Sequence, residues 1–394
     1  MTPNFDQPIA RENTHAVKLD VRQAVFGRED VIPVWVADMD FAAPQAVTRA
    51  LVTRAEHPVY GYTVFPESLY QAMIDWFASR HGWQIKREWI VMAPGVVPSL
   101  NAACMAFSGP GDGVIIQPPV YPPFFGSARD TGRRIIENPL LQDAETGHYR
   151  MDLEHLEQCA ARPEARMIIL CSPHNPVGRV WTDSELESVL AIARRYRLLV
   201  ISDEIHCDLA YPGQKPHRVL ASLARAGDAV VTAVAPSKTF NIPGLGLSAV
   251  VIPDAGHRRA LKAVFDSMHL PQGNPFSVAG FEAAYRHGGE WLDQLLVYLR
   301  GNRDYVLEQV TRRLPGIRTG APEATYLMWL DCRELGLDDT ALRTFFVEKA
   351  GVGMNPGVSF GPTGSGFMRL NIGCPRSVLA EVIERLERAL QARG

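Results

Sequence analysis

Six short runs of consecutive apolar residues recur through the middle of the chain. They cover residues 89–93, 114–117, 167–171, 198–202, 229–233 and 247–252. Runs of this length suit strands that are buried on both faces of a largely parallel sheet. Amphipathic stretches lie between them, and one begins at the capping residues Thr182 and Glu185 and continues to about Arg195. This alternation of strands and helices predicts an α/β fold.

The pattern changes after about residue 290. A helical pattern over 290–314 is followed by strands over 326–330 and 367–371 and by helices over 339–349 and 377–392. These residues predict a smaller α+β domain, which we assign to 290–394. The large domain is assigned to 51–289, and residues 1–50 are expected to pack with the small domain. A chain of 394 residues is long enough for two such domains.

The composition, 46% hydrophobic and 21% charged, is typical of a soluble globular protein. A net charge of −3 predicts no nucleic-acid partner and no anionic membrane surface as a partner. No apolar run reaches the roughly 18 residues of a membrane span, and the N-terminus lacks the pattern of a signal peptide. The six cysteines are scattered without a C-x-x-C pair, so we expect a reducing, cytoplasmic location and no metal site.

One lysine lies directly after a predicted buried strand. Lys238 follows the β-branched stretch 230–232 and is surrounded by small and apolar residues, and the chain has only six lysines in all. Burial disfavours the charged ammonium, and a neutral amine can form a Schiff base, which is how enzymes bind pyridoxal 5'-phosphate (PLP). The alternative is a surface lysine whose stem covers apolar neighbours.

Polar residues also follow other predicted strands, at the edge where ligands bind in open α/β sheets. Asp203 follows the run 198–202 and could pair with a protonated ring nitrogen of PLP or simply cap the next helix. Asn175 lies in a proline-rich turn after 167–171 and could hydrogen-bond the phenolic oxygen of the cofactor or serve only the turn. Tyr121 follows 114–117 and could stack on a cofactor ring or be a structural aromatic residue.

Two further features suggest anion binding. Gly95, Val96 and Val97 precede a helical pattern, and the free N–H groups at a helix start can bind phosphate, although an ordinary strand-to-helix turn fits the same residues. Arg369 lies within a predicted strand among apolar residues, where a guanidinium requires a carboxylate partner. That partner would be the α-carboxylate of a substrate or an internal acidic residue.

Taken together, these residues resemble a known family. Asn175-Pro176-x-Gly178, Asp203, Ser237-Lys238 and Arg369 match the motifs of fold-type I PLP enzymes of the aminotransferase class I/II superfamily, and the resemblance covers essentially the whole chain. Within it the chain is most similar to the MalY/PatB-type C–S lyases, the cystathionine β-lyase branch. The markers of that branch are residues 38–41, 61–62, 171–176, 202–206, 237–243 and 369–376.

The resemblance implies a fold and a set of site residues. The fold is a large PLP-binding domain with a mostly parallel seven-stranded sheet, plus a smaller α+β domain. The implied catalytic residues are Lys238, Asp203, Tyr121 and Tyr62, and the implied substrate-binding residues are Arg369, Asn175 and Tyr121. The implied cofactor-binding residues are Val96, Val97, Tyr121, Asn175, Asp203, His206, Ser237, Lys238 and Tyr62.

The chain departs from the superfamily pattern at three positions. Ala235 and Gly246 replace a hydroxyl residue and an arginine that bind the cofactor phosphate in many aminotransferases, and His206 replaces a tyrosine. Phosphate binding would then depend more on Ser237, the Val96 and Val97 backbone, and Tyr62 from a partner subunit. These changes favour a lyase over a transaminase.

The resemblance implies cleavage of L-cystathionine or a related L-cysteine S-conjugate to a thiol, pyruvate and ammonia by a homodimer with composite active sites. The first alternative is an aminotransferase that uses the same site. The second is a regulatory or binding protein on a PLP scaffold, since a fold does not determine function.

Overall fold

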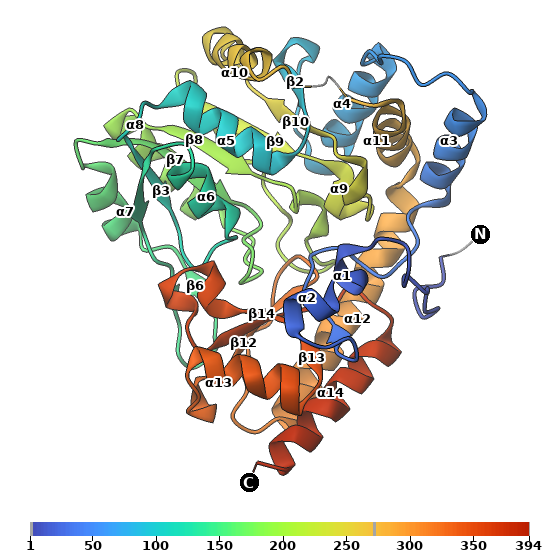
Figure 1. The fold of residues 1–394 in the computed structure, drawn as a ribbon. Coiled ribbons are helices and arrows are strands. Elements are labelled where there is room, and N and C mark those ends of the chain that lie inside the picture. The colour runs from blue at the N-terminus through green and yellow to red at the C-terminus, as the bar shows by residue number, and fades with distance from the viewer. Residues whose placement is uncertain (1–2, 271–272, 394) are drawn as a thin grey trace.

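The computed structural model describes residues 3–270 and 273–393. A large sheet fills the upper part of Figure 1, and a smaller lobe built from the C-terminal third of the chain lies below it. In spatial order the large sheet contains β2 (Ile90–Ala93), β10 (Ser248–Val251), β9 (Val230–Val234), β8 (Leu199–Asp203), β7 (Ala165–Cys171), β3 (Gly113–Ile116) and β4 (Arg134–Glu137). β10 alone runs in the direction opposite to the other six strands, so the prediction of a mostly parallel seven-stranded sheet is confirmed.

Both faces of this sheet are covered by helices, which explains the continuous apolar runs. Val114 and Ile116 of β3 pack in one apolar cluster with residues of α5 and α10, whereas Ile115 packs in another with residues of α7 and α8. The helices of this part of the chain are α3 (Gln45–Glu56), α4 (Glu67–His81), α5 (Val96–Phe107), α6 (Pro123–Arg129), α7 (Leu153–Ala160), α8 (Asp183–Tyr196), α9 (Pro236–Thr239), α10 (Ala255–Ser267) and α11 (Pro275–His287).

One local feature of these elements was predicted from the sequence and one was not. The Thr182 side chain accepts a hydrogen bond from the backbone N–H of Glu185, whose side chain bonds back to Thr182, so the predicted cap of α8 is confirmed. The strand β4 was not among the six predicted runs. It is one of the two edge strands, and only its Ile136 is fully buried.

The smaller lobe is built around an antiparallel sheet. Its strands in order are β11 (Arg318–Thr319), β12 (Leu327–Asp331), β15 (Phe367–Asn371) and β14 (Asn355–Pro356). Its helices are α12 (Gly289–Arg313), α13 (Asp339–Thr344) and α14 (Arg376–Gln391). The helix predicted over 339–349 is therefore shorter, and residues Phe345–Lys349 continue it as a π-helical turn.

The N-terminal residues lie against both parts of the chain. After the short helices α1 (Val17–Asp20) and α2 (Arg22–Phe26), the strand β1 (Ile32–Pro33) pairs in parallel with β13 (Val352–Gly353) of the lower lobe, near which the blue helices lie in Figure 1. Helix α3 packs instead against α11 of the upper part. A last pair of strands, β5 (Leu141–Gln142) and β6 (Tyr149–Arg150), forms a separate two-stranded sheet.

All six cysteines are buried and carry free thiols. Across residues 3–270 and 273–393, no helix is both long enough and apolar enough to cross a membrane.

Candidate active site

The ends of three neighbouring strands bring the predicted polar residues to one edge of the large sheet. Cys171 at the end of β7 pairs with Asp203 at the end of β8, and Asp203 pairs with Ala233 of β9. The turn that holds Asn175 begins just after Cys171, and Lys238 follows β9 on the short helix α9. The sequence prediction that these residues share one sheet edge is therefore correct in its topology.

Lys238 lies partly buried at this edge, on the short helix that follows β9. Its Nζ donates a hydrogen bond to the backbone carbonyl of Ala37, at 2.6 Å. Burial, reinforced by the charge of Arg369, lowers the pKa of the Lys238 amine from 10.5 to about 8. Lys18 is more fully buried, but it forms ion pairs with Asp38 and Asp40, so it is not an alternative reactive amine.

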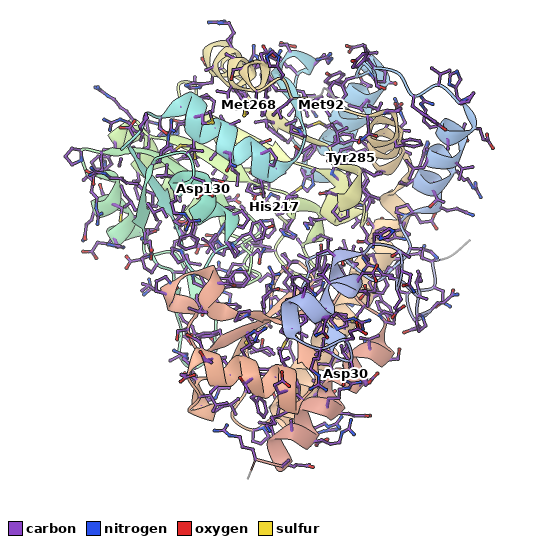
Figure 2. The ribbon with its side chains drawn as sticks, in the orientation of Figure 1. Asp30, Met92, Asp130, His217, Met268 and Tyr285 are labelled. Carbon is purple, nitrogen blue, oxygen red and sulfur yellow. The ribbon has the colours of Figure 1, made fainter. Side chains whose placement is uncertain are left out.

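Asp203 is a buried carboxylate with few donors. Burial raises its pKa from 3.8 to about 7, although a hydrogen bond from the backbone N–H of Ile205 at 3.1 Å acts in the opposite direction. The neighbouring Glu204 also raises this pKa, and it lies in its own buried network, with His217 (labelled in Figure 2) at 2.8 Å. A cationic group beside Asp203 would keep it ionised.

Arg369 is buried, and its hydrogen-bond partners among the described residues are all neutral. Its guanidinium donates to Asn175 Oδ1 at 3.0 Å, to Asn355 Oδ1 at 2.7 Å and to the Trp35 carbonyl at 2.9 Å. Its Nε is buried without a partner, and no carboxylate of the described residues forms an ion pair with it. Arg369 therefore forms no internal salt bridge within the described residues, which was one of the two predicted alternatives. Its guanidinium is suited to bind an external carboxylate.

Two more predicted residues surround the same space. His206 is buried, its Nδ1 has no hydrogen-bond partner among the described residues, and burial lowers its pKa to about 3. Burial raises the pKa of Tyr121, and the charges of Arg369 and Asp203 also act on this residue. Both side chains therefore share the electrostatic environment of the site.

The predicted phosphate loop is the start of α5. Val96 and Val97 occupy its first turn, Pro98 has no N–H to offer, and the first backbone bond within the helix runs from Ser99 to Gly95. The amides of Val96 and Val97 are thus free to bind an anion. Ser237, in the first turn of α9, is partly exposed.

Tyr62 is placed differently from the other predicted residues. It lies in the segment between α3 and α4, and its side chain is completely exposed. Val59, Tyr60 and Val64 on the same segment are also exposed. Within one chain, the structure does not bring Tyr62 to the strand ends.

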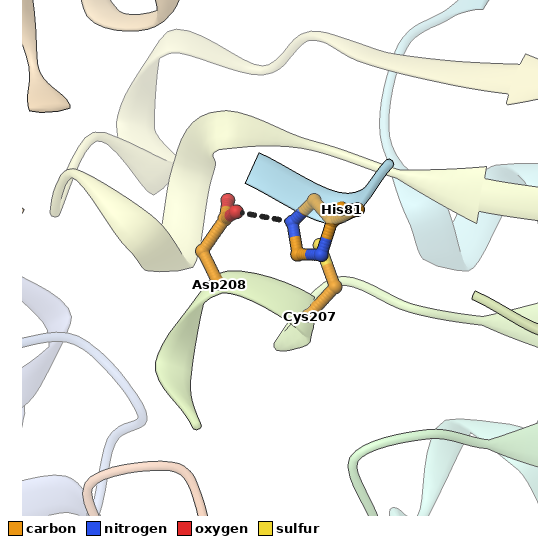
Figure 3. A group of neighbouring side chains, drawn as sticks. All are labelled: His81, Cys207 and Asp208. Carbon is orange, nitrogen blue, oxygen red and sulfur yellow. Dashed lines mark hydrogen bonds and ion pairs between the residues drawn. The ribbon is translucent and has the colours of Figure 1, made fainter. Parts of the chain in front are cut away.

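A buried group of titratable side chains lies next to the lysine turn. His81, Cys207 and Asp208 lie close together (Figure 3), and their potential ligand atoms are within 4.8 Å of one another. The Asp208 carboxylate already accepts hydrogen bonds from His81 at 2.7 Å, Trp76 at 3.0 Å and Thr239 at 2.8 Å. We interpret this group as a support for α9, because Thr239 follows Lys238 directly.

Replacing Asp208 by alanine is expected to destabilise the protein by about 3 kcal/mol, since three buried donors lose their acceptor. The free energy of unfolding from denaturant titration measures this loss. The matched control is Asp183→Ala, which removes an exposed carboxylate 3.0 Å from Arg218 and should cost less than about 1 kcal/mol. Equal losses in the two variants would contradict the supporting role of Asp208.

Several residues of the site were not identified from the sequence. Trp35 and Ala37 contribute backbone carbonyls, Asn355 holds the guanidinium of Arg369, and Tyr326 donates its hydroxyl to Ala37 at 2.9 Å. None of these four residues lies in a motif identified from the sequence, although Ala37 directly precedes the branch marker 38–41 and Tyr326 begins the predicted strand 326–330.

Comparisons with known proteins agree with this geometry. The family described as aminotransferase class I and II matches residues 29–386. Cystathionine beta-lyase PatB of Bacillus subtilis is 42% identical over 98% of this chain and 100% of its own length. Protein MalY of Escherichia coli is 34% identical over 99% of both chains. The crystal structure of cystalysin from Treponema denticola, which contains a pyridoxal 5'-phosphate cofactor, aligns with a TM-score of 0.95 and 36% identity over 100% of both chains.

The fold and the strand-end site thus define a protein of the fold-type I class. The chain belongs to the aminotransferase class I and II family, with cystathionine beta-lyases among its relatives. The resemblance stated from the sequence is therefore confirmed.

Proposed function

We propose that this protein is a PLP-dependent C–S β-lyase that cleaves L-cystathionine or a related L-cysteine S-conjugate to a thiol, pyruvate and ammonia. The observation that carries the proposal is the buried Arg369, which meets only neutral groups of the described chain and shares its site with Asn175 and Lys238. An amino acid is the substrate class that provides both a carboxylate for this arginine and an amine beside the lysine.

The residues present fit PLP. Lys238 offers an amine of lowered pKa to the aldehyde, and the buried Asp203 offers a carboxylate to the ring nitrogen. The amide of Asn175 would donate to the phenolic oxygen of the cofactor. His206, whose Nδ1 has no partner among the described residues, would also contact the cofactor, and Tyr121 would stack on the ring. The Val96 and Val97 amides and Ser237 would hold the phosphate.

The roles of the protein residues in catalysis follow from these placements. Arg369 binds the α-carboxylate with Asn175, which fixes the orientation of Cα. The cofactor, when bound, withdraws the electron pair that remains after Cα loses its proton. Lys238 is the general base for that proton, because a pKa of about 8 leaves part of the amine neutral near pH 7. The electron pair left at Cα then forms the Cα=Cβ bond as the Cβ–S bond breaks, which releases the thiolate, and water hydrolyses the freed aminoacrylate to pyruvate and ammonia.

The decisive experiment is a substrate panel read by pyruvate release, with and without 2-oxoglutarate. Pyruvate and thiol formed from L-cystathionine without any keto acid establish the lyase. Turnover that requires 2-oxoglutarate would instead identify the alternative aminotransferase. No turnover with any L-cysteine S-conjugate, with the cofactor bound, would overturn the lyase.

We further propose that the active site is composite and that Tyr62 of one subunit completes the phosphate site of its partner. Two observations support this assignment. Tyr62 is fully exposed on the segment between α3 and α4, together with three other exposed apolar side chains. Ala235 and Gly246 offer no side chain that could bind the phosphate. The shared site predicts a homodimer.

The composite site is tested by complementation between inactive subunits. Tyr62→Phe and Lys238→Ala homodimers should each be impaired, and mixing them under subunit exchange should restore activity above either parent. One site of each heterodimer then carries both defects and the other carries neither. Proven exchange without recovery, despite an impaired Tyr62→Phe parent, would contradict the shared site.

The division into domains at residues 51–289 and 290–394, with residues 1–50 assigned to the smaller one, remains our proposal. The pairing of β1 with β13 supports it, whereas α3 packs against α11 of the large domain.

The six free thiols support a reducing compartment such as the cytoplasm.

A further inference from the structure

Residues 35–41, here called the strap, pass through the active site and are held there by side chains that bind their backbone. Asn371 Nδ2 donates to the carbonyls of Val36 at 2.6 Å and Asp38 at 2.7 Å. Asn241, three residues after Lys238, donates to the carbonyls of Met39 and Phe41, both at 2.8 Å. The Asn241 side chain also accepts from the Met39 N–H, at 2.9 Å.

These contacts fix the peptide units on either side of Ala37. Asn371 belongs to β15, the strand that carries Arg369, and Asn241 belongs to the turn that carries Lys238. The strap therefore hydrogen-bonds both to the strand that carries Arg369 and to the turn that carries Lys238. Ala37 lies between the two residues whose carbonyls Asn371 binds. The Ala37 carbonyl accepts hydrogen bonds from Lys238 at 2.6 Å and from the Tyr326 hydroxyl at 2.9 Å.

We infer that the Ala37 carbonyl is the resting acceptor for the ε-amine of Lys238 whenever this amine is not covalently engaged, and that Asn371 is the positioning residue that holds this carbonyl in place. During turnover, which rests on the proposed function, the same contact would hold Lys238 while it carries the proton taken from Cα. A carbonyl oxygen stabilises an ammonium donor more than a neutral amine, so the contact favours the protonated lysine.

Other groups near Lys238 act on the same amine and must be kept constant in a test. Arg369 opposes its protonation, whereas Asp38 and Asp203 favour it. Asp38 is itself held by Arg11 and Lys18. His206 also lies within the electrostatic reach of Lys238. Asn371→Ala and Tyr326→Phe each remove a polar group without adding or removing a carboxylate or a guanidinium near Lys238.

The test measures the pKa of Lys238 by NMR in the cofactor-free protein labelled with [13Cε]lysine. Only six lysines contribute signals, and Lys238→Ala assigns the relevant one. Asn371→Ala should lower the pKa of Lys238 by about 0.5 or more, because the ammonium loses its fixed acceptor. Tyr326→Phe should raise it, because Lys238 no longer shares the carbonyl with a second donor.

The matched control is Asn138→Ala. Asn138 is a buried asparagine whose side chain donates to the carbonyl of Asp152 at 3.0 Å and accepts from Gln117 at 3.0 Å, and neither partner belongs to the strap, so its removal should leave the Lys238 titration unchanged. Shifts of the same sign in Asn371→Ala and Tyr326→Phe, no shift in either, or an equal shift in the control would overturn the inference. If Asn371→Ala does not fold, the direction of the Tyr326→Phe shift decides alone. Because neither cofactor nor substrate is present, this result is independent of the lyase assay.

Discussion

Lys238→Ala is expected to abolish covalent cofactor attachment and to lower lyase turnover by at least about 10⁴-fold, since it removes both the point of attachment and the general base. Borohydride reduction of the wild-type holoenzyme should place the pyridoxyl group on the peptide that contains Lys238, as read by mass spectrometry. Lys262→Ala changes an exposed lysine on α10 and serves as the control, with attachment and turnover unchanged. A pyridoxyl group on any other lysine would refute the assignment.

The rate of this attachment should also depend on pH in a defined direction. Only the neutral amine attacks an aldehyde, so the rate should rise with pH as Lys238 loses its proton. Since burial lowers its pKa to about 8, the midpoint is expected near pH 8 rather than near 10.5. Absorbance during reconstitution of the cofactor-free protein across pH 6–10 gives this midpoint, and a value near 10.5 would exclude a buried reactive lysine.

The central strands could be predicted because burial on both faces leaves a continuous apolar signature. Every residue of β3, β8 and β9 is buried, and each had been predicted to within one residue at its ends. The edge strand β4 has exposed or half-exposed positions at Arg134, Ile135 and Glu137, so its pattern resembles that of a loop. The sequence therefore indicated the buried strands, including the edge strand β2, better than the partly exposed β4.

The strand-end site was predictable for a related reason. In a parallel sheet, the residue type that follows each strand is visible in the sequence, and register places these residues together. For Arg369 the sequence left open an internal or an external carboxylate, and this choice required the structure. Its partners Asn175 and Asn355 lie 194 and 14 residues away, and both are neutral.

The contacts of the strap could not be predicted by the same reasoning. Backbone carbonyls such as that of Ala37 exist at every residue and carry no side-chain signature. Asn241 and Asn371 lie within the branch markers 237–243 and 369–376, but the sequence does not show that residues 36–41, which are 200 residues or more away, are their partners. The contacts proposed for Tyr62 are likewise not visible within one chain, because its proposed partner lies in another subunit.

Asp203→Asn is expected to lower kcat by at least about 10²-fold, because the amide keeps the size of the carboxylate but removes the negative partner of the ring nitrogen. Charge-assisted hydrogen bonds are roughly twice as strong as neutral ones, and the electron-withdrawing capacity of the ring depends on its remaining protonated. Steady-state kinetics at saturating cofactor, with bound cofactor quantified, separates this loss from weakened binding. Asp203→Glu, which restores the charge on a longer side chain, should lose less activity than Asp203→Asn.

The pH dependence of cofactor binding provides a second measure of this interaction. In the cofactor-free protein the pKa of Asp203 is raised to about 7 by burial, so the wild-type carboxyl is largely neutral below this pH and charged above it. The ratio of wild-type to Asp203→Asn cofactor affinity should therefore be largest above pH 7 and shrink as the pH falls through about 7. Equilibrium titration with PLP from pH 5.5 to 8.5 measures this ratio. A ratio that stays constant over the range, together with near-normal turnover of Asp203→Asn, would show that the carboxylate is not the partner of the ring.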